Sequence, residues 1–557
     1  MKINQPPKFI DVAILSLFAV LITFNPNFMH RDINFFEVGL YLPGIQSILN
    51  GEIPYRDFFH LRGPVELYVP AFLMNIFGMH LTVLYAYFYV GSVLCLIFGI
   101  FIAREILKSR FMLYCLVPVF IARTYPRVVY TYWGGLRYAL GLLTLWFVVR
   151  YFKKEQKAWM FWAGISTALG LLTSIEVGIC SLLGILGSLL VSRIFAVQKT
   201  QEIYKAFSLF IFGFVAITVP YFFYLHAQGA LLPFFDTMIT VVTKMEKTLN
   251  PRLVSVYPQN LAEAIPAMLI PGHINFKQMT PSYAYIAVAA YLIYRIRKRT
   301  FLKSDLAVVA VGIYGFVLYN TGFRSLWAAQ FEMALQPEKI LYFFILEAIL
   351  LWVVMKEPAI QKFSEMKYLV NVLLIFFFAF SWSYALKRFN HRFFAFQFLT
   401  YKLTGKNTNA LSPWANRQTK VLDIERARGL VVSKTDAEEL EQIDAFVKVN
   451  IPKGDLLFTY PEIPAYNFFF NRRFVGRFPW ATASWFKDEW HQEYIDALKK
   501  ARPKHLILGK VTKSDWQQVY LGPPLNRQKY NEVMDYINSH YIKVQETPYS
   551  YLYQRLD

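Results

Sequence analysis

Long apolar segments recur along the first two thirds of the chain, and short polar loops separate them. A helix needs ~20 mostly apolar residues to cross a hydrocarbon core of ~30 Å. We therefore interpret eleven segments as transmembrane helices. They cover residues 9–26, 81–103, 111–124, 134–150, 158–174, 177–194, 205–225, 281–296, 305–320, 340–356 and 367–386. This pattern predicts a polytopic α-helical membrane protein.

Basic residues concentrate in alternate loops, for example YFKKEQK and RIRKRTFLKSD. Cytoplasmic loops collect Lys and Arg, so these loops and the N-terminus are expected on the cytoplasmic side. The odd number of spans then places residues 387–557 outside the cell. The net charge of +21 follows from such loops, and no nucleic-acid partner is expected.

Two long outer loops interrupt the membrane domain, which we assign to residues 1–386. The first, 27–80, contains two short apolar segments, Phe35–Leu49 and Pro64–Gly78, which we predict to be helices at the membrane surface. Counting the second of these as a span would turn every basic loop outward. The second loop, 226–280, contains the predicted interfacial helix LLPFFDTMITVVTKMEKTL.

The tail, residues 387–557, lacks an apolar run of membrane length. SKTDAEELEQIDAFVKVN and DEWHQEYIDALKKA have the pattern of helices, whereas DLLFTY and KHLILG have the pattern of short buried strands. This alternation predicts a soluble, extracytoplasmic α/β domain.

Ionisable side chains gather in the predicted outer segments, where they are costly unless they face a cavity or a partner. The first loop contains Asp32, Glu37, Arg56, Asp57, His60 and Arg62, and the other outer edges contain Arg123, Arg127, Arg137, Glu176 and Arg324. Outer arginines run against the usual charge bias, and the planar guanidinium suits phosphate. The set predicts an anion site, although any one arginine could instead form a structural ion pair.

Glu37 is flanked by aromatic and aliphatic residues in NFFEVGLYL. Burial there would raise its pKa unless a cation such as Arg56 or Arg62 restores the charged form. The alternative is that Glu37 reaches water from an amphipathic helix. His30 and the acids of this loop match no metal-ligand spacing, so no metal is expected.

The first loop resembles that of the GT-C glycosyltransferases, in particular the protein O-mannosyltransferases, the lipid A aminoarabinose transferases and their uncharacterised bacterial relatives. The likeness lies in an outer acid, Glu37, then NGEIPYRDF, then Arg62-Gly63-Pro64 in place of Lys-Pro-Pro. LLFTYPEIPAYNFFFNRRFVGRFPW in the tail is similar to a YF-x-x-x-R segment of the bacterial relatives. The chain departs from the pattern at Val38, where relatives have a second acid, and in RSLWAAQ, which lacks the Asp and His of Arg-Ser-Asp-x-x-His.

This resemblance implies an enzyme of the bacterial inner membrane that moves a sugar from a polyprenyl-phosphate donor to a glycan, lipid or protein acceptor, with inversion. Glu37 would be the general base, with Asp32 as the rival acid, and no cofactor is implied. Arg62, Arg137 and Arg324 would hold the lipid phosphate. Arg56, Asp57, His60, Arg123, Arg127 and Glu176 would line the site.

Two other functions fit the membrane pattern. A transporter or flippase for lipid-linked sugars would also need an outer cavity lined with arginine, but it does not usually need a large outer tail domain. A non-catalytic scaffold for envelope assembly is compatible with the altered RSLWAAQ element.

Overall fold

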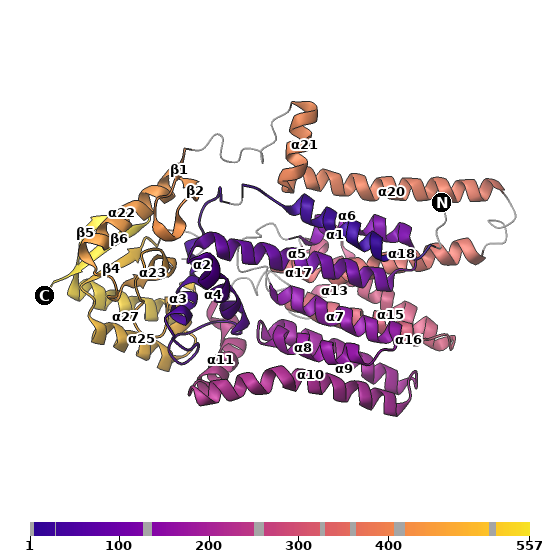
Figure 1. Ribbon diagram of the computed structural model, residues 1–557, viewed down its shortest axis with the longest axis horizontal. Coiled ribbons are helices and arrows are strands. Elements are labelled where there is room, and N and C mark those ends of the chain that lie inside the picture. The colour runs from indigo at the N-terminus through magenta and orange to yellow at the C-terminus, as the bar shows by residue number, and fades with distance from the viewer. Residues whose placement is uncertain are drawn as a thin grey trace.

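The computed structural model describes residues 5–27, 29–125, 136–249, 261–273, 275–322, 329–356, 364–405, 418–511 and 520–556. Helices dominate the chain up to residue 405, and a sheet with covering helices follows. Figure 1 shows the long helices side by side at one end of the molecule and the strands at the other end.

Each of the eleven segments that the sequence predicted to span the membrane corresponds to one helix, with ends that differ by a few residues. These are α1 (Phe9–Thr23), α5 (Leu81–Ile106), α6 (Arg110–Thr124), α7 (Leu136–Lys154), α8 (Ala158–Leu171), α9 (Ile175–Ile194), α10 (Thr200–Ala227), α15 (Pro281–Arg297), α16 (Lys303–Gly322), α18 (Gln336–Lys356) and α20 (Ser364–Arg392). Within the described residues, α5, α9, α10, α16 and α20 are long and apolar enough to cross a bilayer. These helices indicate a multi-pass membrane protein. The number of times that the chain crosses the membrane remains a prediction.

The first outer loop contains three helices where two were predicted. The segment Phe35–Leu49 is divided into α2 (Phe35–Gly39) and α3 (Leu42–Leu49), with Tyr41 at the junction. The other predicted surface helix is α4 (Val65–Phe77). In the second outer loop, α11 (Leu231–Leu249) matches the predicted interfacial helix and is followed by α13 (Leu261–Leu269) and α14 (Phe276–Met279).

Besides α13 and α14, two short helices of the helical region were not predicted. The first is α17 (Ala329–Ala334), which precedes α18. The second is α21 (Phe394–Thr404), which follows α20 directly because α20 continues past residue 386 to Arg392.

The C-terminal region contains a four-stranded sheet in the order β3-β4-β6-β5. β3 (Phe458–Tyr460) and β4 (His505–Gly509) are the two predicted strands and pair in parallel, whereas β5 (Tyr541–Glu546) and β6 (Ser550–Arg555) add an antiparallel hairpin that was not predicted. The predicted helices are α22 (Lys434–Asn450) and α25 (Asp488–Ala501). The remaining elements are β1 (Thr419–Val421), η2 (Glu425–Ala427), β2 (Val431–Ser433), α23 (Ala465–Phe469), α24 (Ala481–Ser484) and α27 (Pro524–His540).

The first outer loop is attached to the C-terminal region along most of its length. Near its start, Arg31 N–H donates to Val431 O, and Val431 N–H donates to Met29 O, both at 2.9 Å. Near its middle, Phe59 N–H donates to Arg477 O at 2.7 Å. One continuous cluster of buried apolar side chains runs from the membrane helices through this loop into the C-terminal region. The sheet and the first loop therefore form one packed unit.

Arg426 of η2 strengthens this attachment. Its buried guanidinium donates to Gln46 Oε1 of α3 at 2.9 Å, to Phe468 O at 2.7 Å and to Asn471 Oδ1 at 2.7 Å. Burial lowers the pKa of Arg426 to about 10, which leaves the side chain charged at neutral pH.

Candidate active site

Glu37 lies on α2, a five-residue helix between the membrane helices and the C-terminal region. Asn34 caps this helix, since its Oδ1 accepts a hydrogen bond from Glu37 N–H at 3.0 Å. At the end of α2, Gly39 packs so closely on the C-terminal region that a Cβ would lie 2.6 Å from Pro464 Cγ and 2.8 Å from Ala465 N. The backbone of residues 464–465 therefore sets how near α2 can approach.

Aromatic contacts fix the orientation of α2. The ring of Phe35 meets Tyr466 edge-on, with centroids 5.2 Å apart. The ring of Phe36 meets Trp480 and Tyr520 edge-on, at 6.3 and 6.1 Å. Two neighbouring residues thus anchor α2 in an aromatic surface of the C-terminal region.

The charge of Glu37 acts on two tyrosine hydroxyls, those of Tyr85 on α5 and Tyr520. The guanidinium of Arg31 lies over the ring of Tyr85, 5.4 Å from its centroid. Arg31 and Glu37 therefore both act on Tyr85, and the expectation that Arg56 or Arg62 keeps Glu37 charged stays a prediction.

Arg62 belongs to a buried polar cluster with Tyr41 and Glu66. Tyr41 Oη donates to Glu66 Oε2 at 2.6 Å and accepts from Arg62 Nη1 at 2.9 Å, and Arg62 Nη1 lies 3.6 Å from Glu66 Oε2. The side chain of Glu66 is fully buried and that of Arg62 is 12% exposed. Burial raises the pKa of Tyr41 well above its ordinary value, so Tyr41 stays a neutral hydroxyl.

The backbone next to Arg62 is locked to the turn between α8 and α9. Gly63 N–H donates to Thr173 O at 3.2 Å and Val65 N–H donates to Leu172 O at 3.0 Å. A Cβ on Gly63 would lie 2.0 Å from Leu172 O, so this approach requires glycine.

Two of the predicted phosphate ligands act on Tyr41: Arg62 by a hydrogen bond and Arg137 through its charge. Arg137 is a buried residue of α7 whose guanidinium lies 4.6 Å from the ring centroid of Tyr138, and its charge reaches the Tyr41 hydroxyl as that of Arg62 does. Glu176, in the first turn of α9, acts electrostatically on Tyr138. The third predicted ligand, Arg324, lies outside the described residues, as does Arg127.

His60 is buried near this cluster, with its ring 6.1 Å from that of Tyr41. Burial, and then the positive charge of Arg62, lower the pKa of His60 to about 3. The imidazole is therefore neutral at physiological pH, so His60 can accept or donate one hydrogen bond but contributes no charge.

Arg56 and Asp57 form an ion pair with each other. Arg56 Nε and Nη2 donate to the two carboxylate oxygens of Asp57 at 2.8 and 2.7 Å, and Nη1 donates to Gln228 O at 2.7 Å. This pair ties the first outer loop to the turn after α10. Its geometry corresponds to the structural ion pair that the sequence left open as an alternative.

The charges of Asp32 and Arg123 act on residues outside the Arg62 cluster. Asp32 is exposed and acts electrostatically on Asp436 and Tyr549 of the C-terminal region. Arg123 lies at the end of α6, where its charge reaches Arg388 of α20.

Sequence reasoning missed two buried acids, Glu66 and Glu462. Glu66 was hidden in a segment interpreted only as apolar, PVELYVPAFLMNIFG. Glu462 precedes α23, and its Oε1 accepts a hydrogen bond from Thr482 N–H at 2.9 Å. Burial raises the pKa of Glu462 to about 8, and its charge reaches the same Tyr520 hydroxyl as that of Glu37.

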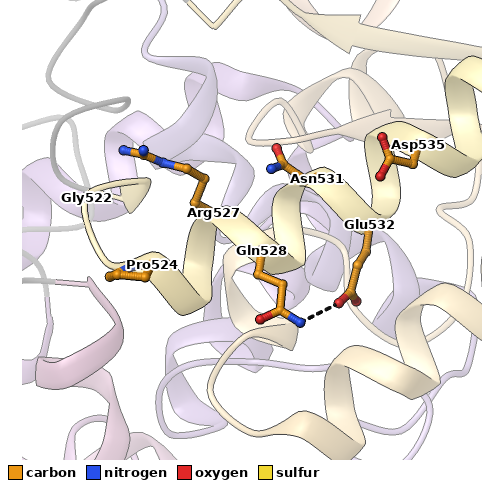
Figure 2. A pocket seen from close by; sticks show the side chains of 7 residues that line it. All are labelled: Gly522, Pro524, Arg527, Gln528, Asn531, Glu532 and Asp535. Atoms are coloured by element: carbon orange, nitrogen blue, oxygen red, sulfur yellow. Dashed lines mark hydrogen bonds between the residues drawn. The ribbon is translucent and has the colours of Figure 1, made fainter.

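Three sizeable cavities lie outside this cluster. One is a polar pocket of about 430 Å³ on the C-terminal region, where Arg527, Gln528, Asn531, Glu532 and Asp535 project from α27 (Figure 2). A second, of about 510 Å³, lies between the first outer loop and the C-terminal region and is lined by Asp57, Glu52 and Arg473 among others. The third is an apolar cavity of about 750 Å³ along α15 and α16. Among the described residues, no group of three or more His, Cys, Asp or Glu side chains could hold a metal ion.

No known family pattern and no curated protein sequence matches the chain. Solved structures do match. ArnT from Cupriavidus metallidurans in the apo state aligns with a TM-score of 0.52 and 11% identity over 98% of this chain and 96% of ArnT. ArnT bound to undecaprenyl phosphate aligns with a TM-score of 0.52 and 11% identity over 97% of this chain and 96% of ArnT.

The archaeal oligosaccharyltransferase AglB from Archaeoglobus fulgidus, in complex with an inhibitory peptide and a dolichol-phosphate, is also similar. Its TM-score is 0.51 at 12% identity, over 93% of this chain and 72% of AglB. Identities this low establish the fold alone. The chain therefore has the fold of the GT-C glycosyltransferases, as the residues of its first outer loop indicated.

Proposed function

We propose that this protein is an integral-membrane glycosyltransferase that moves a sugar from a polyprenyl-phosphate donor to an extracytoplasmic acceptor. The observation that carries this proposal is the pairing of two features within one loop. Glu37 lies on a helix clamped by the C-terminal region, and Arg62 lies in a buried cluster joined to the end of that helix through Tyr41. The fold shared with ArnT, which has been solved bound to undecaprenyl phosphate, supports the lipid-phosphate donor.

In the proposed reaction, the acceptor hydroxyl oxygen attacks the anomeric carbon of the donor sugar. Its proton passes to the Glu37 carboxylate while the bond between the anomeric carbon and the phosphate oxygen breaks. The bonding electrons leave with the lipid phosphate, and attack opposite to the leaving group inverts the anomeric centre. A positioned base contributes ~10²–10⁴-fold to such a step.

Arg62 and Arg137 would stabilise the negative charge that grows on the departing phosphate. Arg62 is suited to this role because its neighbours fix it in place: Tyr41, Glu66 and the backbone around Gly63. A preorganised cation stabilises developing charge without reorganising during the reaction. Arg324 remains a third proposed ligand on the sequence evidence.

This account places eleven helices across the membrane, with the C-terminal α/β domain on the outer side. The acceptor would then enter between that domain and the first loop, where α2 carries Glu37. The sequence also allowed a transporter or a scaffold, but no described feature favours either.

Binding of an isoprenyl phosphate to the purified full-length chain tests the donor assignment. We expect Arg62→Ala to weaken binding about tenfold or more, since hydrogen bonds to charged groups are worth ~1.5–3 kcal/mol. Arg62→Lys should restore only part of the affinity, because an ammonium cannot form a bidentate contact. Arg428→Ala is the matched control, since Arg428 is 73% exposed and pairs only with the exposed Asp423 among the described ion pairs. Equal affinity of wild type and Arg62→Ala would contradict the assignment.

A further inference from the structure

A second group of arginines lies where α6 and α20 meet, away from the Arg62 cluster. Arg392, the last residue of α20, donates through Nη1 to Ala122 O at 3.0 Å and to Tyr125 O at 3.2 Å. Its Nη2 forms an ion pair with Glu332 of α17. These bonds hold the end of α20 against the end of α6.

The same contacts bring two more arginines together. Arg123 follows Ala122 on α6, and Arg388 lies one helical turn before Arg392 on α20. The charges of Arg123 and Arg392 both reach Arg388, whose guanidinium lies 5.5 Å from the ring centroid of Tyr384. Ring stacking holds Arg388 in place without neutralising it.

The acids near this group do not balance its charge. Glu332 neutralises Arg392, and among the residues that the structure describes no ion pair links Arg123 or Arg388 to a carboxylate. Two positive charges therefore stand close together at the edge of the membrane domain. Their mutual repulsion would be relieved by an anion that carries about two negative charges.

Helix α21 indicates that the anion belongs to the membrane surface. It follows the arginine group directly and exposes large apolar side chains: Phe398 (45%), Leu399 (49%), Tyr401 (41%) and Leu403 (76%). Figure 1 shows α21 projecting from the end of α20. A helix with exposed aromatic and leucine side chains and a basic residue, Lys402, is typical of the membrane interface. The arginine group therefore lies at the depth of lipid headgroups.

We propose that Arg123 and Arg388 bind the phosphate monoester headgroup of a membrane lipid, with Arg392 holding the two helices in place. A phosphate monoester carries about −1.5 to −2 charges near neutral pH, which matches two guanidinium groups, whereas a phosphodiester carries only −1. Both an isoprenyl phosphate, the carrier released by the proposed transfer, and phosphatidic acid have this headgroup. The site itself does not depend on the transfer reaction.

The test measures binding of short-chain phosphatidic acid to the full-length chain in a neutral detergent. Arg388→Gln and Arg123→Gln should each weaken binding about tenfold or more. Arg388→Lys should keep part of the affinity, and Arg428→Gln is the control for loss of one surface charge. Melting temperatures measured without lipid show whether each variant is folded. Unchanged affinity in folded Arg388→Gln and Arg123→Gln would overturn the proposal.

Competing ligands test the headgroup and separate this site from the donor site. An isoprenyl phosphate should displace phosphatidic acid, whereas phosphatidylglycerol and inorganic phosphate should displace it poorly. Equal displacement by phosphatidylglycerol would overturn the monoester assignment, and equal displacement by inorganic phosphate would overturn the lipid assignment. Arg62→Ala should leave phosphatidic acid binding unchanged, so a failure of the proposed transfer would not remove this site.

Discussion

Replacing Gly39 by alanine tests whether the C-terminal region positions the proposed base. The new Cβ would lie 2.6 Å from Pro464 Cγ and 2.8 Å from the backbone nitrogen of Ala465. The proline ring could adjust slightly, but the backbone of α23 cannot. Helix α2 would therefore retreat by about 1 Å, and a misplacement of that size can cost ~10²-fold in rate. Overpacking would also reduce the free energy of unfolding by about 1–3 kcal/mol.

The assay separates a displaced base from a weakened donor site. With saturating donor, we expect the kcat of Gly39→Ala to fall by about 10²-fold, while isoprenyl phosphate binding stays close to wild type because Arg62 is held by other contacts. Gly170→Ala is the matched control, since its Cβ would meet only Leu140 Cβ at 3.8 Å, an ordinary contact. A folded Gly39→Ala variant with wild-type kcat would refute the positioning argument. So would an equal loss in both variants.

Two further predictions concern the buried acid and the topology. The pKa of Glu462 is about 8 in the folded state, against an ordinary value of 4.5. Between these pH values the folded state holds a proton that the unfolded state has lost. The free energy of unfolding should therefore fall as pH rises from 4.5 to 8, by at most ~1.4 kcal/mol per pH unit. Glu462→Gln should flatten this dependence in melting temperatures recorded from pH 5 to 8, and an unchanged slope would show that Glu462 is not its source. For the topology, compartment reporters inserted at Asp423 and at Arg299 should report opposite sides of the membrane, since eleven crossings place these positions on different sides. Both reporters on the same side would end the eleven-span arrangement.

The membrane helices could be predicted because the rule behind them is local. Apolar length and charged loops locate each helix, so one helix corresponds to each predicted span, although the ends differ by several residues, as in α20. The same holds for β3, β4, α22 and α25, whose apolar periodicity is visible within a few residues. The hairpin of β5 and β6 was missed because β5 is mostly exposed and β6 is a short strand of mixed polar and aromatic residues, so neither carries a clear apolar run.

The site was harder to predict because its contacts join distant parts of the sequence. Arg56 and Arg62 are six residues apart, yet one pairs with its neighbour Asp57 and the other with Glu66. No local pattern distinguishes these outcomes. Glu462 could not be linked to Glu37 from the sequence, since the two lie in distant segments and act on the same tyrosine, Tyr520, only in the folded chain. Gly39 became informative only once α23 was seen against it.

The most direct test of the account compares Glu37→Gln with Asp32→Asn in a transfer assay. Glutamine keeps the shape of Glu37 but cannot accept the proton, so we expect transfer to fall by about 10²-fold or more while isoprenyl phosphate binding survives. Glu37→Asp should keep part of the activity. Asp32→Asn should have little effect, because the exposed Asp32 is the rival to the acid that the resemblance places at Glu37. Loss of transfer in Asp32→Asn with full activity in Glu37→Gln would contradict the assignment of the base, and full activity in both would contradict the transferase mechanism itself.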